Sequence, residues 1–416
     1  MRLSRESLEN IAIDQGSSFY ILDPMRFREN YFALLNTFRS FYPNTSIAYS
    51  YKTNYVPRFC QIVKELGGYA EVVSGMEISL AQRIGMQTEK IFYNGPYKEE
   101  EYIEKLLIEG GIVNVDSIDE LKKIDLIAKK WPKNKLRIGL RCNFDVCDNI
   151  ISRFGIDVFS CDFINAVSTI SKNSNLQLVG LHCHFATRSQ LSWENRTKGM
   201  LKIIDEYFSD HLDMLEYVSL GGGLYGCMPE KLKTQFDFKI PSFEDYAYAS
   251  ARPFYEYFKQ HSDVIRPLLI IEPGTALVAD SVKYVTKVVS IKSIKEKTIV
   301  TLSGSIFNIN PNSHRKNVPI EIYPSNSTSR LVVHDALFAG YTCVESDYLY
   351  KDYSGEIGLG DFIVFNDAGS YSIVMKPPFI MPNVAVIEID DCIKNGYSVI
   401  KRKETFEDVF QTYKLV

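Results

Sequence analysis

The sequence lacks the features that would assign the protein to a membrane, an oxidising compartment or a nucleic acid. None of its apolar runs is long enough to cross a bilayer, and the N-terminal residues 1–7 are charged and have no apolar signal-peptide core. The eight cysteines form neither a disulfide framework nor a metal-binding spacing, and the net charge of -4 is spread along the chain. We therefore expect a cytoplasmic protein with reduced thiols and no nucleic-acid or membrane partner.

Internal repeats, low-complexity tracts and long linkers are also missing from the sequence. The chain has 416 residues, of which 45% are apolar and 24% are charged, as in ordinary globular proteins. This length predicts two or three domains with ample material for a large core.

The first two thirds of the chain alternate short apolar runs with amphipathic helical stretches, such as the helix expected over residues 25–41. Eight strand candidates cover residues 46–51, 69–73, 91–93, 112–115, 136–140, 178–182, 217–220 and 268–271. Eight β/α units in about 240 residues predict an α/β fold of the (β/α)8 barrel type. Polar or glycine-rich stretches just past a strand would then lie on its catalytic face.

After residue 280 the pattern changes to strands separated by turns. The candidates cover residues 284–291, 298–302, 330–333, 361–365 and 384–389. They predict a C-terminal all-β domain, either a barrel or a sandwich.

Lys52 lies at the end of the first barrel strand, in the stretch Ser-Tyr-Lys-Thr-Asn. A lysine held among aromatic side chains is partly desolvated, which lowers its pKa and makes the amine a usable nucleophile. An imine-forming lysine needs this property, although a lysine also commonly ends a strand without any function.

A run of three glycines, Gly221 to Gly223, directly follows a predicted strand. Glycines let backbone N–H groups close around an anion, and the loops after the late strands of a barrel are a usual phosphate site. A simple tight turn would have the same sequence.

His182 and His184 are two residues apart and therefore lie on the same side of a strand or of its exit. The spacing could bind a metal, but no third ligand is evident nearby. Stacking of an imidazole on a flat cofactor ring is the better functional interpretation, and a buried core histidine is the alternative.

Glu272 ends the last barrel strand, where Pro273 and Gly274 turn the chain. A glutamate facing a pyridine nitrogen would keep that nitrogen protonated, whereas a capping or arginine-paired glutamate would have no chemical role. Lysine, histidine, glycine loop and glutamate together match the imine, ring face, phosphate and pyridinium of pyridoxal phosphate.

With these residues in this order, the chain resembles the fold-type III pyridoxal-phosphate decarboxylases, which include the diaminopimelate, ornithine and arginine decarboxylases and have an alanine-racemase-like barrel. The resemblance runs almost end to end. Its further matching segments are residues 19–23 (FYILD), 51–54 (YKTN), 71–77 (EVVSGME), 114–117 (NVDS), 153–155 (RFG) and 402–408 (RKETFED).

The resemblance implies that Lys52 forms the imine with the cofactor, that His184 stacks on its ring and that Glu272 pairs with its pyridine nitrogen. It also places Glu71 near the cofactor, where aspartate is more usual. The residues implied for the phosphate are Thr187, Gly222, Gly223, Gly274 and Tyr371.

The resemblance further implies an obligate homodimer in which Cys343 and Asp347 of one subunit enter the site of the other. The cysteine would deliver a proton to the substrate carbon after CO2 leaves. The implied domains are a cofactor-binding barrel over residues 25–280 and a β-domain over residues 281–416, which the strand within residues 1–24 joins.

Three positions depart from the family pattern. Thr275 replaces an arginine that serves phosphate or a substrate carboxylate, Ser303 replaces an aspartate that meets a distal amine, and Val344 replaces an acidic substrate contact. Arg315 lies in the basic loop 308–316, where the family places a substrate loop, and its charge could meet an acidic or carrier-attached substrate.

We therefore expect a decarboxylase acting on an amino acid or derivative with a non-standard distal group, in specialised biosynthesis of the siderophore or antibiotic type. The alternatives are a diaminopimelate decarboxylase of lysine biosynthesis, an amino-acid racemase on the same barrel and a non-catalytic regulatory homologue. Retention of Lys52, Glu272 and Cys343 speaks against the last of these.

Overall fold

The computed structural model describes residues 3–260, 266–309, 316–326, 329–389 and 396–414. The chain forms two compact units. The barrel unit comprises Glu29–Gly226 and Ile240–Ala276, and the β unit comprises Met1–Arg28, Cys227–Lys239 and Leu277–Val416.

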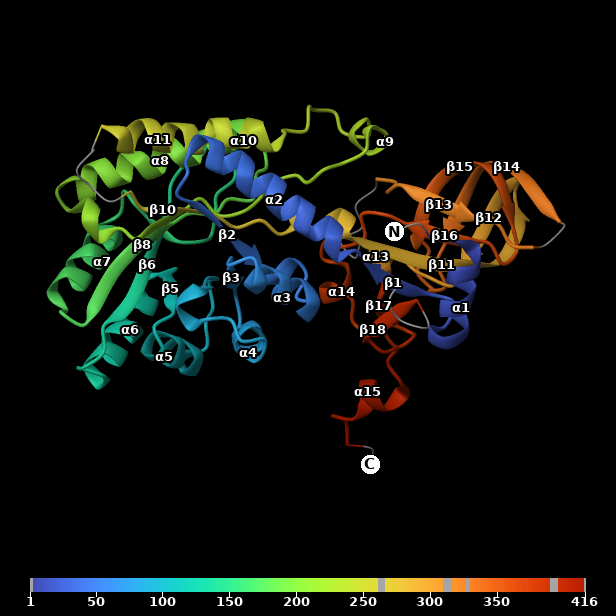
Figure 1. The fold of residues 1–416 in the computed structure, drawn as a ribbon, viewed down its shortest axis with the longest axis horizontal. Helices are drawn as coiled ribbons and strands as arrows, with labels where there is room; N and C mark the ends of the chain where they lie inside the picture. The colour runs from blue at the N-terminus through green and yellow to red at the C-terminus, as the bar shows by residue number, and fades with distance from the viewer. Residues whose placement is uncertain (1–2, 261–265, 310–315, 327–328, 390–395, 415–416) are drawn as a thin grey trace. The chain divides into compact units, whose positions relative to one another are not determined.

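Eight parallel strands close into a barrel, as the sequence predicts (Figure 1). Closure is completed where Leu269–Ile271 pairs with Thr45–Ile47 and where Val113–Val115 pairs with Ile138–Leu140. The strands are β2 (Thr45–Ser50), β3 (Tyr69–Val72), β4 (Ile91–Tyr93), β5 (Ile112–Val115), β6 (Leu136–Asn143), β8 (Leu176–His182), β9 (Tyr217–Ser219) and β10 (Leu268–Ile271). A two-residue strand, β7 (Ile156–Asp157), extends the pairing at the end of β6.

The barrel strands are apolar almost throughout because both of their faces are covered. All six residues of β2 are buried, and one core cluster joins Ala48, Phe92, Val179 and Tyr217 from four strands. Helices lie outside the strands (Figure 1). They include α3 (Pro57–Glu65), α4 (Gly75–Arg83), α5 (Glu100–Ile108), α6 (Ile118–Lys130), α7 (Cys161–Lys172), α8 (Gln190–Phe208), α10 (Phe243–Ala249) and α11 (Ala251–Lys259). The helix expected over residues 25–41 is α2 (Pro24–Phe41).

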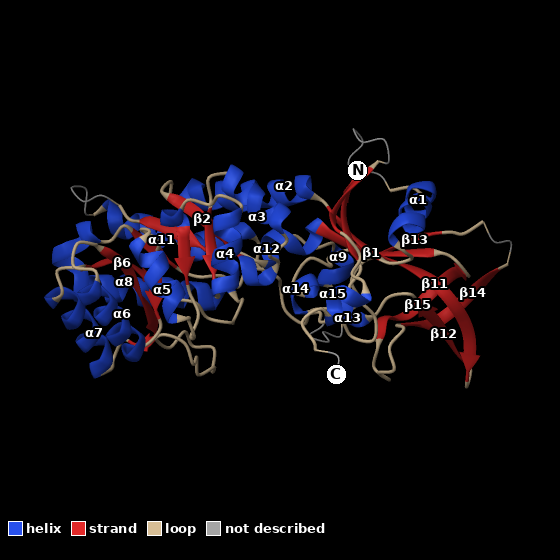
Figure 2. Ribbon diagram, turned by 90° about the horizontal axis from the view of Figure 1, so that it is seen from below, coloured by secondary structure: helices blue, strands red, loops and turns tan. Residues whose placement is uncertain are grey.

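The β unit contains a nine-stranded sheet whose longest strands are visible in Figure 2. Its main path runs β15-β14-β12-β11-β1-β17-β18, and β16 joins β13 to β11. The strands are β1 (Phe19–Leu22), β11 (Val282–Ile294), β12 (Lys297–Leu302), β13 (Ile320–Tyr323), β14 (Arg330–Ala339), β15 (Tyr348–Gly358), β16 (Phe362–Phe365), β17 (Ala385–Ile389) and β18 (Tyr397–Lys401). Helix α1 (Arg5–Gln15) packs Leu8 and Ile11 into the core of this sheet.

The β unit thus confirms the expected all-β class, and its sheet takes β1 from the N-terminus. Strand β1 pairs antiparallel with β11 and parallel with β17. The strands β13, β15 and β18 were not predicted. Strand β15 has Asp352 at φ 58 and Gly355 at φ 154, and such residues are typical of turns in a sequence.

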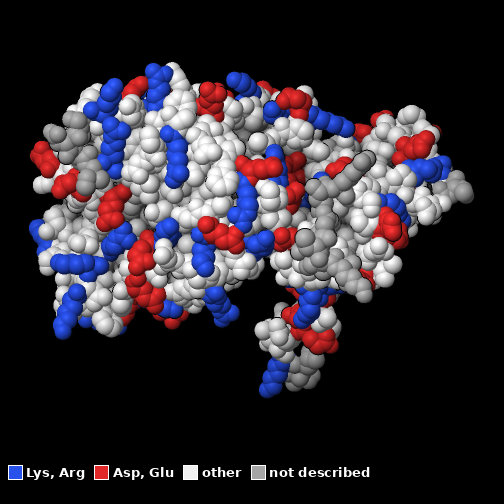
Figure 3. All heavy atoms as spheres, viewed as in Figure 1, with Lys and Arg blue, Asp and Glu red and all other residues white. Residues whose placement is uncertain are grey.

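No helix within the described ranges is long and apolar enough to span a membrane. Lys and Arg side chains are interspersed with Asp and Glu side chains over the face drawn in Figure 3.

A buried acid in the β unit gives a testable pH dependence. Asp367 follows β16 with a left-handed backbone (φ 55), and burial, together with the charge of Asp280, raises the pKa of its carboxyl to about 7. Between the ordinary pKa and pH 7 the folded state therefore binds more protons than the unfolded state, so its stability falls as the pH rises. Above pH 7 the cost of ionising Asp367 is fully present.

We expect Asp367→Asn to stabilise the protein by about 1 kcal/mol at pH 8, because asparagine tolerates the same backbone and carries no charge. The difference should be clearly smaller at pH 5, where Asp367 is protonated in the folded state and only the unfolded chain still loses the proton. Urea unfolding of both proteins at the two pH values measures it. Asp352→Asn, at an exposed left-handed position (φ 58), is the control and should show no such pH dependence. Equal shifts at both pH values would contradict the titration of Asp367.

Candidate functional site

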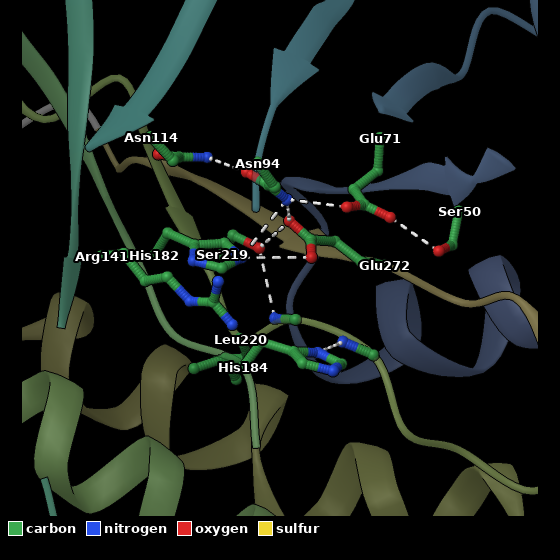
Figure 4. Close-up of polar contacts among 12 residues, drawn as sticks. Ser50, Glu71, Asn94, Asn114, Arg141, His182, His184, Ser219, Leu220 and Glu272 are labelled. Carbon is green, nitrogen blue, oxygen red and sulfur yellow. Dashed lines mark hydrogen bonds and ion pairs between the residues drawn. The ribbon is translucent and has the colours of Figure 1, made fainter. Parts of the chain in front are cut away.

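Lys52 and Glu71 form an ion pair at the carboxyl ends of two neighbouring strands. Lys52 follows β2 in a short 3-10 turn (Tyr51–Thr53), and Glu71 lies on β3. The Lys52 Nζ donates to Glu71 Oε2. The same oxygen accepts from Ser50 Oγ at 2.6 Å, a contact drawn in Figure 4. The glutamate side chain is 1% exposed and the lysine side chain is 35% exposed, so Glu71 fixes the ammonium at the rim of the barrel. The predicted aromatic surroundings are therefore only part of its environment, because a carboxylate contacts the amine directly.

Glu272 is a buried carboxylate placed just after β10. Its Oε1 accepts from Ser219 Oγ at 2.8 Å, and its Oε2 lies 3.2 Å from His182 Nε2 (Figure 4). Burial works against ionisation, but the charge and the hydrogen bond of His182 hold the pKa of the Glu272 carboxyl below its ordinary value. The site therefore keeps a negative charge at a fixed point.

Asn94 connects the two carboxylates. Its Nδ2 donates to Glu71 Oε1 and to Glu272 Oε1, each at 3.1 Å (Figure 4). Its Oδ1 accepts from Asn114 Nδ2 at 2.7 Å, and Asn114 Oδ1 in turn accepts from the hydroxyl of Tyr217. Sequence reasoning did not single out Asn94, although an asparagine directly after the apolar strand β4 was an available signal.

The two histidines have different partners. His182 bonds to Glu272, whereas His184 Nδ1 accepts from the N–H of Gly222 at 2.9 Å. Burial, followed by the charge of Lys52, holds the pKa of His184 well below its usual value. His184 is therefore a neutral imidazole whose remaining proton is on Nε2. Within the described part of the chain, no group of three or more His, Cys, Asp or Glu side chains could hold a metal.

The glycines of the site are required by close approach between loops. A Cβ at Gly222 would lie 2.3 Å from the backbone oxygen of Glu272, and a Cβ at Gly274 would lie 1.9 Å from Thr53 Oγ1. Gly221 and Gly223 also have positive φ angles, of 71° and 86°. The loops after β9 and β10 and the turn after β2 are thereby packed together around the site.

Comparison with known proteins identifies the family of this constellation. The profile described as "Pyridoxal-dependent decarboxylase, pyridoxal binding domain" matches residues 30–279. The chain belongs to the pyridoxal-dependent decarboxylase family. The protein is accordingly a pyridoxal-phosphate-dependent amino-acid carboxy-lyase, as the sequence motifs predict.

Individual relatives are similar along most of their length. A diaminopimelate decarboxylase of Aquifex aeolicus is 26% identical over 97% of this chain and 93% of its own. The "L-glutamyl-[BtrI acyl-carrier protein] decarboxylase" of Niallia circulans is 25% identical over 87% of this chain and 86% of its own. The crystal structure of the Methanocaldococcus jannaschii diaminopimelate decarboxylase has a TM-score of 0.84 at 25% identity and covers 98% of this chain and 94% of that one.

The groups gathered in the barrel fit pyridoxal phosphate. A carboxylate kept ionised by His182 suits a protonated pyridine nitrogen, and a neutral imidazole with a fixed Nδ1 suits a ring face. An amine and a glycine loop, contributed by Lys52 and Gly221 to Gly223, stand at the same strand ends. The barrel unit thus holds side chains that fit the imine, the ring and the pyridine nitrogen of the cofactor.

Arg196 of α8 is a site component that the sequence reasoning missed. It is fully buried, and its Nη1 donates to the carbonyl oxygens of Leu220 (3.3 Å) and Gly222 (2.6 Å). Its Nη2 donates to those of Phe185 and Thr187, both at 2.7 Å. Burial lowers the pKa of Arg196 to about 10, so the guanidinium stays charged and joins the loops after β8 and β9.

Thr187 and Tyr371, which are expected at the phosphate, have the following surroundings. The Thr187 hydroxyl donates to Asp148 Oδ2 at 2.6 Å, so its proton points to a carboxylate. Tyr371, in the β unit, has a left-handed backbone (φ 59) at the start of α14 (Ser372–Met375).

Ser303 has a structural role in the β unit. Its Oγ lies 2.8 Å from Ser18 Oγ and 3.0 Å from Thr286 Oγ1, and it accepts from the N–H of Lys287 at 2.9 Å. These bonds hold β11 and the end of β12 to the chain before β1. The Ser303 hydroxyl therefore already makes its hydrogen bonds to groups within the β unit.

Asp347 is likewise bonded within its own loop. Its Oδ1 accepts from the N–H of Ile306 at 2.7 Å, and its Oδ2 accepts from Thr342 Oγ1 at 2.6 Å. These bonds fix the turn that presents Cys343, which is exposed. Asp347 thus shapes the cysteine loop.

The predicted basic loop is described only in part, because Arg315 lies outside the described residues. Its neighbour Lys316 donates from Nζ to the carbonyl of Gln235 at 2.5 Å and lies 4.1 Å from the centroid of the Phe236 ring. The Lys316 charge is therefore held by a contact inside the β unit.

Proposed function

We propose that the protein decarboxylates an amino acid or amino-acid derivative whose distal group is not the free amine of lysine or ornithine or the amino-carboxylate of diaminopimelate. The observation that carries this proposal is the Ser303 network: at the position where the resemblance implies an aspartate that meets a distal amine, this chain has a neutral hydroxyl, and it is bonded to Ser18 and Thr286. Thr275 and Val344 likewise put neutral side chains where the resemblance implies a charged contact to the cofactor or the substrate. Lost polar partners of this kind weaken transition-state binding of the ordinary substrates.

The similarity to an L-glutamyl acyl-carrier-protein decarboxylase supports a derivatised or carrier-attached substrate. The alternative is a diaminopimelate decarboxylase, which is favoured by the names of several relatives.

The proposed roles follow the geometry of the barrel. Lys52 would hold the aldehyde carbon of the cofactor, Glu272 its pyridine nitrogen and His184 its ring face. The phosphate would be held by Thr187, Gly222, Gly223, Gly274 and Tyr371. Bound pyridoxal phosphate supplies the electron sink that lets the bond between Cα and the carboxylate break.

The chain's own residues supply the proton chemistry. Glu71 Oε2, bonded to Lys52 Nζ, is placed to take a proton from the ammonium and so to free the nucleophile. Glu272 stays ionised and would stabilise positive charge on the pyridine nitrogen of the bound cofactor. We propose a homodimer in which Cys343 and Asp347 of the other subunit complete the site, with the thiol returning a proton to the substrate carbon.

The test is CO2 release by cofactor-loaded enzyme offered meso-diaminopimelate, lysine, ornithine, arginine, their acylated or carboxyl-bearing derivatives and a carrier-attached glutamyl thioester. We expect kcat/KM for a derivatised substrate to exceed that for diaminopimelate by about 100-fold or more. Diaminopimelate turnover at an ordinary enzymic rate would establish the alternative. Racemised product without CO2 would contradict decarboxylation.

A further inference from the structure

Arg188 is anchored at the carboxyl end of the barrel by its backbone. It follows Thr187 in the loop between β8 and α8, and its carbonyl accepts from the hydroxyl of Tyr246 at 2.6 Å. The same hydroxyl accepts from the N–H of Tyr225 at 3.4 Å. Tyr246 is fully buried, so it ties the Arg188 loop to the loop after β9.

The guanidinium of Arg188 has a defined place but few polar partners. It lies 5.3 Å from the centroid of the Tyr225 ring, and its Nη2 is 3.5 Å from Thr275 Oγ1. Among the described residues the guanidinium contacts this ring and this hydroxyl, and no carboxylate pairs with it. An arginine has five N–H donors in a planar fork, so most of its hydrogen-bonding capacity remains for another group.

The location favours an oxyanion as that group. Tyr225 and Thr275 belong to the loops after β9 and β10, which are the seventh and eighth strands of the barrel. These loops are side by side, since a Cβ at Gly226 would lie 3.2 Å from the Cα of Ala276. In (β/α)8 barrels the loops after these two strands frequently form a phosphate site. An arginine fork also binds phosphate or carboxylate bidentately.

We propose that Arg188 is an anion-binding residue that directs its fork to an oxyanion at the ends of β9 and β10. The oxyanion is a phosphate monoester of the cofactor or a carboxylate of the substrate. Arg188 thereby supplies a guanidinium beside Thr275, where the side chain itself is neutral. This inference rests on the proposed function for its cofactor and its substrate.

The test compares Arg188→Gln and Arg188→Lys with the matched control Arg252→Gln. Arg252 also lies over a tyrosine ring, at 4.7 Å from Tyr248, but it is paired with Glu256 at 2.8 Å on α11. Spectroscopic titration measures the dissociation constants of pyridoxal phosphate and of pyridoxal, which lacks the phosphate. Steady-state kinetics with the most active substrate of the panel measures KM.

If the oxyanion is the phosphate, Arg188→Gln should weaken binding of pyridoxal phosphate by about 10- to 100-fold and leave that of pyridoxal unchanged. If it is the carboxylate, cofactor affinity should stay constant while KM rises by a similar factor. Arg188→Lys should show a smaller loss in either case, because it keeps the charge without the fork.

The proposal would be overturned if Arg188→Gln kept both its cofactor affinity and its KM within about twofold of the wild type. Arg252→Gln should show changes of that small size, as ordinary surface substitutions do. An equal loss for pyridoxal and pyridoxal phosphate would also overturn it, because the fork would then not recognise the anion. The binding measurement needs no turnover. A loss specific to pyridoxal phosphate in an enzyme that decarboxylates nothing in the panel would therefore uphold the anion site and refute only the proposed function.

Discussion

Lys52→Ala is expected to lower the rate of CO2 release by on the order of 10⁴–10⁶, the range found when an enzyme loses its nucleophile. Lys52 stands at the end of β2, its Nζ bonded to Glu71, whose carboxylate is fixed by Ser50 and Asn94. Alanine removes the amine with its methylene stem and leaves the Glu71 carboxylate bonded to Ser50 and Asn94. The loss of activity should therefore come from the missing nucleophile, and the variant should still fold.

Two measurements separate these causes. Borohydride should attach the cofactor covalently to the peptide containing residue 52 in the wild type and not in Lys52→Ala, as mass spectrometry would show. The control Lys64→Ala removes an exposed lysine from the next helix, α3, and should keep its activity within about twofold. More than about 1% residual activity in Lys52→Ala would contradict the assignment of Lys52 as the nucleophile.

Much of the barrel could be predicted because its strands are short apolar runs buried on both faces. Seven of the eight expected strands end within one residue of the observed carboxyl ends, and this precision places Lys52 and Glu272 correctly at the rim. The exception is β6, which continues to Asn143. Its buried Arg141 pairs with Asp116 at 2.8 Å, and a charged residue in a sequence suggests that a strand has already ended.

The polar network behind the site could not be predicted from motifs. Asn94 and Asn114 become functional neighbours only when β4 and β5 are paired, because their partners come from β3, β9 and the end of β10. The same limit applies to Ser303. Its position suggests a substrate contact, whereas its bonds to Ser18 and Thr286 arise from the pairing of distant segments.

Arg196 did leave a signal in the sequence. It lies three residues after Trp193, four before Met200 and seven before Ile203, on the buried face of α8. A charged residue on the apolar face of a helix needs hydrogen-bonding partners inside the protein. In this protein the partners are four carbonyl oxygens from two loops.

Arg196→Met is expected to destabilise the protein by about 3–5 kcal/mol, because it leaves four carbonyl groups in the interior without their donor. The effect should reach the cofactor site. Arg196 bonds to the carbonyl of Gly222, and the N–H of the same residue donates to His184 Nδ1. We therefore expect weaker binding of both pyridoxal phosphate and pyridoxal, since the imidazole loses its support whether or not a phosphate is present.

Urea unfolding and cofactor titration test this expectation, with Lys198→Met as the control on the same helix. Lys198 is exposed and pairs with Glu194 one turn away on the same helix, so its replacement should change stability by less than about 0.5 kcal/mol. Unchanged stability of Arg196→Met would mean that water can replace the guanidinium between the loops. If the affinity fell for pyridoxal phosphate but not for pyridoxal, Arg196 would act on the phosphate. Its role would then not be to support His184 through Gly222.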